Sequence, residues 1–369
     1  MANLSRVTNF ADSLQSDSDT PSQPDIAADG APPSRLSGSA PVVALLMKNE
    51  LLGDAITRVP AYRALRFGLP AHRIVGVYKH TTAWLTTLAH ARGEFLDEIL
   101  IGQPIADGAA ATYGTLRTIN NLEMVFDFRA NLHSWSSFLA ASRLNVKYIA
   151  NVAGFMLRRN VPRGLEVRPD SNVRCYHRAV EIALGRTLPF EYHLAPPADA
   201  VTRAATMLPR GTPAVLLACG NPRSNKSWPR DGWIGLARHL LSRGITPAFL
   251  LGNQEESERE WIAREVPEAM IVDASAAANA EQLPWLFVAL AQHALAAVAV
   301  EGGIGHLIAT SGMPVLTIAG PTNPVRWRPV TPLHWTVWAR EFGSKETAAV
   351  TLEAVVERTE AMLGVSAQR

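Results

Sequence analysis

The stretch of residues 297–329 restricts the fold more than any other part of this chain, because it combines strand, turn and helix signals: AVAVEGGIGHLIATSGMPVLTIAGPTNPVRWRP. Residues 296–300 are small or β-branched and apolar, as in a strand buried on both faces of a parallel sheet. A glycine turn follows, His306 begins a helix, and Gly312 ends it just before Pro314. A second buried strand comes next. The pattern predicts an α/β fold.

The turn itself contains Gly302, Gly303 and Gly305 between strand and helix. Such a turn leaves backbone N–H groups at a helix N-terminus free at the carboxyl end of the sheet, where anionic ligands bind in open α/β folds. The spacing does not match the GxGxxG dinucleotide fingerprint. The residues alone predict a phosphate or carboxylate site and leave a purely structural turn as an equal alternative.

Length and composition are those of a globular protein with two separate cores. The chain has 369 residues, of which 47% are hydrophobic and 18% charged. Cys175 and Cys219 form neither a metal motif nor a disulfide framework, which fits a reducing cytosol. The longest apolar stretch, 286–300, is too short for the roughly 20 residues that span a bilayer. We expect a cytoplasmic protein without a transmembrane helix.

Changes in composition divide the chain. Residues 1–40 contain few large apolar groups and lack the basic and apolar segments of a signal peptide. A Pro- and Ala-rich break begins near Leu188. The predicted parts are a disordered tail (1–40), a first domain (41–190), a linker (191–213), a second domain (214–345) and a terminal helix (346–369) that packs back across the junction.

The first folded stretch predicts a βαβ unit, with strand 42–47, helix 54–67 and strand 74–78. Asp54 stands where the loop becomes the helix. Since Asp caps helix N-termini and complements the helix dipole, the residues alone favour a structural cap for Asp54. Further helices are predicted near 83–92 and 113–120.

Charge is distributed unevenly along the chain. Residues 41–190 carry 18 Lys+Arg against 11 Asp+Glu, whereas residues 200–369 carry 15 of each. A basic first half attracts anionic ligands and acidic lipid surfaces. Nucleic acid is a rival partner, but no nucleic-acid-binding motif accompanies the charge, so none is expected.

Other polar residues stand at predicted strand ends and have ordinary structural interpretations. Asp127, at the end of strand 124–128, is equally a cap or the partner of a nearby arginine. Lys226, after strand 214–218, is most simply an exposed lysine. The acidic run after strand 247–252 fits the solvated start of a helix.

Three segments together resemble glycosyltransferase family 9, the ADP-heptose:lipopolysaccharide heptosyltransferases and their relatives. They are EGGIGHL at 301–307 with GPTNP at 320–324, K-x-W-P at 226–229, and the Gly-Asp pair at 53–54 after an apolar strand. The resemblance covers about 42–363 and implies two Rossmann-like domains facing across a cleft, the GT-B fold.

The resemblance also implies roles for particular residues. Asp54 is then the base that takes the acceptor proton, and Lys226 contacts the donor phosphates. Glu256 and Glu301 hold the nucleotide. The implied donor-binding residues are Lys226, Glu256, Glu301, Gly302, Gly303 and His306, and the implied acceptor-binding residues are Asp127, Arg129 and His133.

The implied activity is inverting transfer of a sugar, a heptose from ADP-heptose, to a hydroxyl of lipopolysaccharide core or a related glycan. The donor is a substrate, and neither a metal nor another cofactor is expected. The acceptor is an anionic glycan or glycolipid, so we expect peripheral contact with the cytoplasmic face of the inner membrane.

Three positions depart from the family pattern. The family usually has Asp followed by Ser or Thr where this chain has Glu301 and Gly302, and a basic residue where it has His133. Two other classes of function therefore stay open. One is a nucleotide-sugar epimerase of the same build, which needs no acceptor, and the other is a nucleotide-binding protein with a degenerate site.

Overall fold

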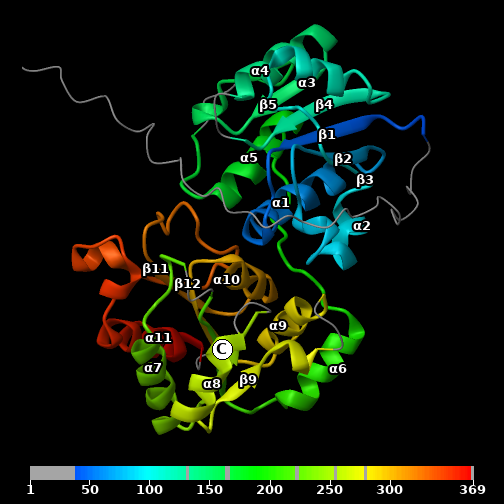
Figure 1. The fold of residues 1–369 in the computed structure, drawn as a ribbon. Coiled ribbons are helices and arrows are strands. Elements are labelled where there is room, and N and C mark those ends of the chain that lie inside the picture. Colours follow the sequence, from blue (N-terminus) through cyan, green and yellow to red (C-terminus); the bar gives the residue numbers. More distant parts are fainter. Residues whose placement is uncertain are drawn as a thin grey trace, which may run out of the picture. The chain divides into compact units, whose positions relative to one another are not determined.

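The computed structural model of this chain describes residues 38–129, 133–162, 167–220, 224–252, 256–277 and 281–366. Almost all of the predicted tail therefore lies outside the described residues. Within them are two six-stranded sheets, coloured blue to green and yellow-green to orange in Figure 1. Both sheets belong to one compact unit that extends over 33–369.

The first sheet has the strand order β3-β2-β1-β4-β5-β6, and its pairs are parallel except β5 with β6. Its strands are β1 (Val42–Met47), β2 (Arg73–Tyr78), β3 (Glu98–Leu100), β4 (Leu122–Asp127), β5 (Lys147–Ala150) and β6 (Arg158–Arg159). The helices of this half are α1 (Leu52–Gly68), α2 (Arg92–Phe95), α3 (Ala109–Leu116), α4 (His133–Leu144) and α5 (Asn172–Leu184).

The second sheet is parallel, with the strand order β12-β11-β10-β7-β8-β9. Its strands are β7 (Ala214–Ala218), β8 (Thr246–Leu250), β9 (Met270–Val272), β10 (Ala296–Val300), β11 (Val315–Ala319) and β12 (His334–Trp338). The helices of this half are α6 (Ala198–Met207), α7 (Arg230–Ser242), α8 (Glu256–Glu265), α9 (Leu283–Ala291), α10 (Gly303–Ile308) and α11 (Leu352–Ser366).

Each sheet contains one switch point. There the later strands of the sheet lie on the opposite side of its first strand from the earlier ones. It lies between β1 and β4 in the first sheet and between β7 and β10 in the second. Both sheets have the Rossmann strand order, and ligands of such sheets bind at the carboxyl ends of the strands beside the switch point. The sequence predicts two Rossmann-like units, and the structure confirms them.

The central strands β1, β7 and β10 have the bounds that the sequence predicts. Every residue in them is buried, because a parallel sheet is covered by helices on both faces. Continuous apolar runs of this kind are the clearest strand signal in the chain.

Helix ends and short helices differ more from the predictions. The helix expected near 83–92 consists of two 3₁₀ turns, Ala83–Leu85 and Ala89–Ala91, followed by α2. The terminal helix begins at Leu352, because the hydroxyl of Thr351 accepts a hydrogen bond from the N–H of Ala354. This helix packs on α7 and on β10, β11 and β12 of the second half.

Three helix contacts connect distant parts of the chain. Helix α1 packs against α5 and against α10, which brings the two predicted ligand-binding turns together. Helix α6 lies inside the range predicted as a linker and packs on α9. In the described part of the chain, no helix has the length and apolarity needed to cross a bilayer.

Candidate active site

A cavity of about 240 Å³ lies at the carboxyl ends of β1, β4 and β5, beside the switch point of the first sheet. Asp54 and Arg58 line it from α1, Arg129 follows β4 and Asn151 follows β5. Arg326, after β11, also lines it. A carboxylate among cationic and amide groups can receive an anionic, polyhydroxylated molecule beside a base.

Asp54 does not cap α1, contrary to the interpretation that the residues alone favour. Leu51 occupies the N-cap position, and Asp54 lies in the first turn. Among the described residues, no hydrogen bond or ion pair engages the Asp54 carboxylate. A half-buried carboxylate that faces a cavity without a partner is suited to accept a proton from a bound molecule.

Gly53 explains how Asp54 comes close to the second half. A Cβ atom at Gly53 would lie 3.4 Å from Cδ2 of His306 and 3.6 Å from the Cα of Gly303. A Cβ at Gly303 would in turn lie 3.1 Å from Cβ of Leu52. The two helix starts therefore approach closely because glycine stands at both positions.

A buried carboxylate holds Arg58 in place. Glu50 is fully buried and accepts hydrogen bonds from Arg58 (2.9 Å), Tyr62 (2.6 Å), Tyr78 (2.6 Å) and Thr82 (2.9 Å). Because these partners are 8 to 32 residues away, no local sequence signal marks Glu50. The network fixes the guanidinium of Arg58 at the cavity wall.

Asp127 and Arg129 form a buried pair. Nε and Nη2 of Arg129 each donate to one carboxylate oxygen of Asp127 at 2.8 Å, and Nη1 donates to the carbonyl of Ile105. Asp127 is fully buried and does not line the cavity, so the arginine-partner alternative is the arrangement observed. His133 begins α4 and is also not among the cavity-lining residues.

A second cavity, of about 330 Å³, lies beside the switch point of the second sheet. It is lined by residues that follow β7, including Lys226, and by the turn after β10, including Glu301, Gly302 and Gly303. The structure thus brings together four of the residues that the sequence predicts to bind the donor. A cation next to a glycine turn is suited to phosphate groups.

Glu301 is anchored through one oxygen and unpaired at the other. Oε1 accepts hydrogen bonds from the N–H groups of Gly320 (3.1 Å) and Thr322 (3.5 Å), whereas Oε2 is buried without a partner among the described residues. Burial raises the pKa of Glu301, and Lys226 with the two N–H groups offsets only part of this effect. Oε2 is therefore placed to meet a hydroxyl of a bound molecule.

His306 lies beneath the glycine turn and does not itself line this cavity. It is 9% exposed, its Nδ1 has no partner among the described residues, and its Cδ2 is the atom that approaches Gly53. Burial, with a smaller contribution from Lys226, lowers the pKa of His306 from 6.5 to about 4. The imidazole is neutral at pH 7 and packs the two helix starts together.

The lowered pKa of His306 predicts a loss of stability in acid. In the unfolded chain His306 binds a proton below about pH 6.5, whereas in the folded protein it does so only below about pH 4. The free energy of unfolding should fall over this interval, by roughly 3 kcal/mol at most from this group. Urea unfolding of His306→Gln should show a smaller fall than wild type. The same change at exposed His80 is the control, and an equal fall in wild type and His306→Gln would contradict the assignment.

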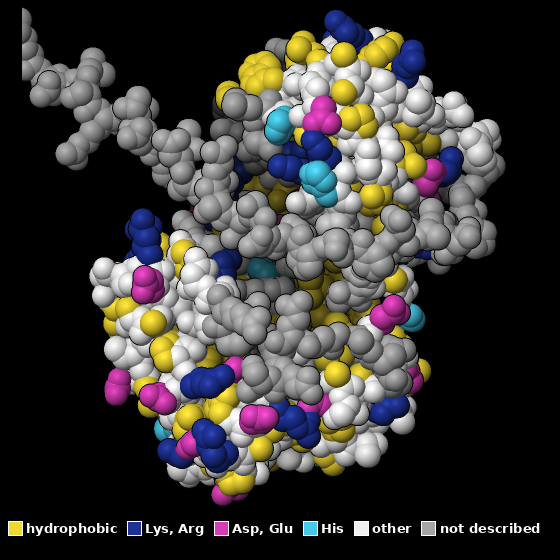
Figure 2. Space-filling model, in the orientation of Figure 1, with side chains coloured by type: hydrophobic (Ala, Val, Ile, Leu, Met, Phe, Trp, Pro, Cys, Tyr) yellow, Lys and Arg dark blue, Asp and Glu magenta, His cyan; other side chains and the backbone are white. Residues whose placement is uncertain are grey.

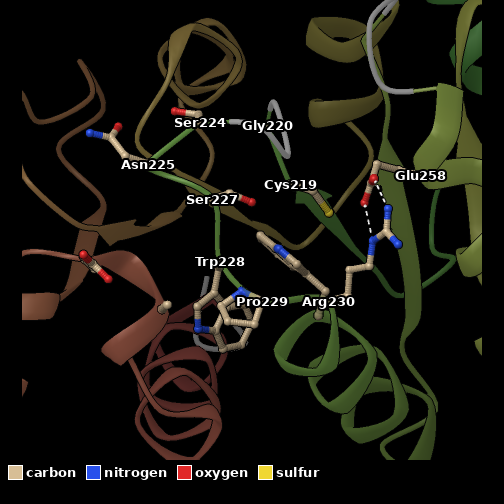
Figure 3. A pocket seen from close by; sticks show the side chains of 12 residues that line it. Cys219, Gly220, Ser224, Asn225, Ser227, Trp228, Pro229, Arg230 and Glu258 are labelled. Atoms are coloured by element: carbon tan, nitrogen blue, oxygen red, sulfur yellow. Dashed lines mark hydrogen bonds and ion pairs between the residues drawn. The ribbon is translucent and has the colours of Figure 1, made fainter.

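A neighbouring cavity, of about 580 Å³, shares Gly220 and Ser224 with the one at Lys226. Figure 3 shows its wall, where Arg230 is paired with Glu258 and Trp228 lies just before α7. The indole N–H of Trp228 donates to the carbonyl of Val350 at 2.8 Å. The cavity is large enough for a nucleoside next to the phosphate-binding turn.

The acidic run at the start of α8 contributes Glu258 to this cavity. Glu258 is buried and bonds to Arg230 and to the indole of Trp261. Glu256 is the first residue of α8, and its side chain lies outside the described residues. The sequence does not single out Glu258, because burial of one glutamate in a run of four depends on the neighbouring helix α7.

Basic and acidic side chains are interspersed over the elements of the second sheet, as Figure 2 shows for one face. This agrees with the equal numbers of the two kinds in residues 200–369. The basic cavity at Asp54 belongs to the half with the excess of Lys and Arg. Charge therefore favours anionic molecules at the first sheet.

Parts of this chain resemble known proteins in sequence. Residues 176–355 match the model of glycosyltransferase family 9 (heptosyltransferase). A 118-residue segment is 33% identical to lipopolysaccharide heptosyltransferase 1 of Pseudomonas aeruginosa. This segment makes up 31% of this chain and 30% of that relative. The chain thus matches less than a third of the length of this curated relative. The resemblance to family 9 that the sequence predicts is confirmed.

Solved structures show the fold of nearly the whole chain. A family 9 glycosyltransferase from Veillonella parvula is 15% identical, with a TM-score of 0.63 over 90% of this chain and 100% of that one. E. coli heptosyltransferase WaaC with ADP is 18% identical, with a TM-score of 0.57 over 87% of this chain and 99% of that one. The two-domain GT-B fold is therefore confirmed.

Proposed function

We propose that this chain is an inverting glycosyltransferase that moves a heptose from ADP-heptose to a hydroxyl of lipopolysaccharide core or a related glycan. Its resemblance to glycosyltransferase family 9 supports this proposal. One observation carries the proposal. An unpartnered carboxylate, Asp54, and a cation, Lys226, line cavities at the two switch points, and the helices α1 and α10 that border these cavities pack together.

The chemistry follows from these positions. Asp54 takes the proton of the acceptor hydroxyl as its oxygen attacks the anomeric carbon of the donor sugar. The bond from that carbon to the phosphate oxygen breaks on the opposite face, so the configuration inverts. Lys226 and the backbone N–H groups of Gly303 and Ile304 stabilise the negative charge of the departing diphosphate, without a metal ion or a further cofactor.

The donor occupies two neighbouring cavities in this proposal. Its diphosphate lies at Lys226, and its nucleoside lies in the 580 Å³ cavity that shares Gly220 and Ser224. Glu256 binds the nucleoside, and Oε2 of Glu301 accepts a hydrogen bond from the donor. The structural neighbour solved with ADP supports an adenine nucleotide.

The acceptor binds at the basic cavity of the first half. Arg58, Arg129 and Arg326 attract its anionic groups, while Asp127 acts by holding Arg129. His133 lies at the start of α4, whose Trp135 and Leu139 are exposed one helical turn apart. Exposed apolar side chains in the half with an excess of Lys and Arg suit a protein that touches the cytoplasmic face of the inner membrane.

The proposal is tested by offering the protein nucleotide sugars together with truncated core glycans and detecting the products by mass spectrometry. Transfer of a heptose to one glycan is the expected result. Conversion of a nucleotide sugar with no acceptor present would instead indicate an epimerase. Binding of nucleotide without turnover of any donor would indicate a binding protein with a degenerate site.

The pair Glu301 and Gly302 offers a further test of the donor. A Cβ atom at Gly302 would meet only the carbonyl of Val300, at 3.9 Å, so a threonine fits there. We predict that Gly302→Thr alone will not improve use of ADP-heptose, because Glu301 extends one methylene further into the cavity than Asp. Glu301→Asp combined with Gly302→Thr should tighten donor binding by about one to two decades, the value of a hydrogen bond to a charged group.

Kinetics with ADP-heptose measure both variants against wild type. A lower activity of the double variant, with turnover of another nucleotide sugar by the unmodified protein, would contradict ADP-heptose as the donor. Glu301→Asp combined with Gly302→Val is the matched control, because valine has the shape of threonine without its hydroxyl.

A further inference from the structure

Asn151 carries a buried amide that no described residue uses. It follows β5 and is 1% exposed, and both Oδ1 and Nδ2 lack a hydrogen-bond partner. Its backbone N–H donates to the carbonyl of Asp127 at 2.9 Å, which fixes the residue in place. A primary amide can accept two hydrogen bonds and donate two, and leaving it unpaired in the interior costs stability. Such a group calls for a ligand that completes its hydrogen bonds.

The amide lies on the wall of the same 240 Å³ cavity as Asp54. Arg58 also lines this cavity, and its Nε is buried without a partner although Nη1 is held by Glu50. Asp54 and Arg58 are four residues apart on α1 and so lie on one helix face. A carboxylate, a guanidinium and an amide therefore share one cavity with hydrogen-bonding capacity left over.

We infer that Asn151 is a specificity-determining residue for the acceptor, which it binds through two neighbouring hydroxyl groups beside the hydroxyl that reacts. Oδ1 accepts from one hydroxyl and Nδ2 donates to the other. This inference rests on the proposed function, since it places the acceptor sugar at Asp54.

A pair of hydroxyls fits Asn151 better than a single charged group does. An anion would use Nδ2 but would set its negative charge against Oδ1, and a cation would use Oδ1 alone. Two adjacent hydroxyls of a sugar satisfy both atoms at once. The anionic groups of the acceptor are left to the cationic side chains Arg58, Lys48 and Arg326 on the same wall.

The test replaces Asn151 by Leu, which has a similar size, and by Asp, which keeps the shape but loses the donor. The assay uses the truncated core glycan on which the wild-type protein is active, and deoxy analogues that lack one of the hydroxyls next to the reacting one. We expect the KM for this acceptor to rise about ten- to a hundredfold in Asn151→Leu, as for the loss of two hydrogen bonds, and to rise less in Asn151→Asp, which keeps Oδ1 as an acceptor. The KM for ADP-heptose should not change.

The deoxy analogues separate recognition from a structural role. For the wild-type protein, an analogue that lacks a hydroxyl bound by Asn151 should be a poorer acceptor than the parent glycan. For Asn151→Leu the same analogue should be as good as the parent glycan, because the contact is already absent. Ser142→Ala is the control, since Oγ of Ser142 is also buried without a partner but does not line the cavity. It should leave both KM values unchanged.

A purely structural amide gives the opposite result. Removing an unsatisfied buried polar group would then raise the midpoint of thermal unfolding in Asn151→Leu, with the acceptor KM unchanged, and the inference would be wrong. If Asn151→Leu does not fold, an unchanged acceptor KM in Asn151→Asp overturns it equally. A wild-type protein that transfers no sugar to any glycan would overturn the proposed function, and this inference with it.

Discussion

Asp54→Asn is expected to slow sugar transfer by roughly 10²–10⁴-fold, because an amide cannot take the proton of the acceptor hydroxyl. The affinity for the nucleotide should stay as in wild type, since Asp54 lines the cavity of the first sheet and the phosphate-binding turn belongs to the second. Single-turnover rates with saturating acceptor and calorimetric titration with nucleoside diphosphate measure the two quantities separately.

The fold should survive this change. Leu51 is the N-cap of α1, and among the described residues the Asp54 side chain holds no hydrogen bond that asparagine would break. Asp199 lies in the first turn of α6 and is exposed, so Asp199→Asn is the matched control for an effect on helix stability. Turnover close to wild type in Asp54→Asn would show that Asp54 is not the base.

Lys226→Ala should weaken binding of a nucleoside diphosphate by about one to two decades and leave the affinity for the bare nucleoside nearly unchanged. The lost contact is with phosphate charge, and a hydrogen bond to a charged group is worth about 1.5–3 kcal/mol. Calorimetric titration with ADP and with adenosine compares the two losses directly.

Removal of Lys226 also changes its neighbours. Lys226 opposes the rise that burial causes in the pKa of Glu301, so Lys226→Ala should raise that pKa further. Lys345 is an exposed lysine of the same half, and Lys345→Ala should affect neither ligand. Equal losses for ADP and adenosine in Lys226→Ala would place its ammonium away from the phosphates.

The sequence predicts the sheets better than the helices around them. The strands 42–47, 214–218 and 296–300 coincide with β1, β7 and β10, because burial on both faces demands an unbroken apolar run. The helix near 83–92 is replaced by 3₁₀ turns whose Thr82 is tied to buried Glu50. That contact spans 32 residues and leaves no trace in a local pattern.

In the site, too, local motifs identify some residues, whereas the role of others depends on tertiary contacts. Local motifs with known family patterns identify Asp54, Lys226 and Glu301, and all three line cavities at the switch points. The strand end at Asp127 looks the same in sequence as a ligand-binding acid. Only its buried pairing with Arg129 distinguishes a supporting role from direct contact.

The sequence by itself determined the α/β fold, the central strands and the residues that stand in recognisable turns, because these depend on neighbours a few positions apart. Tertiary structure decided which polar side chains share a cavity. Asn151 joins Asp54 only because β4 pairs with β1 and β5 pairs with β4, so that strand ends about a hundred residues apart in sequence meet at one edge. Strand order is set by packing across the whole sheet, and a single chain segment does not encode it.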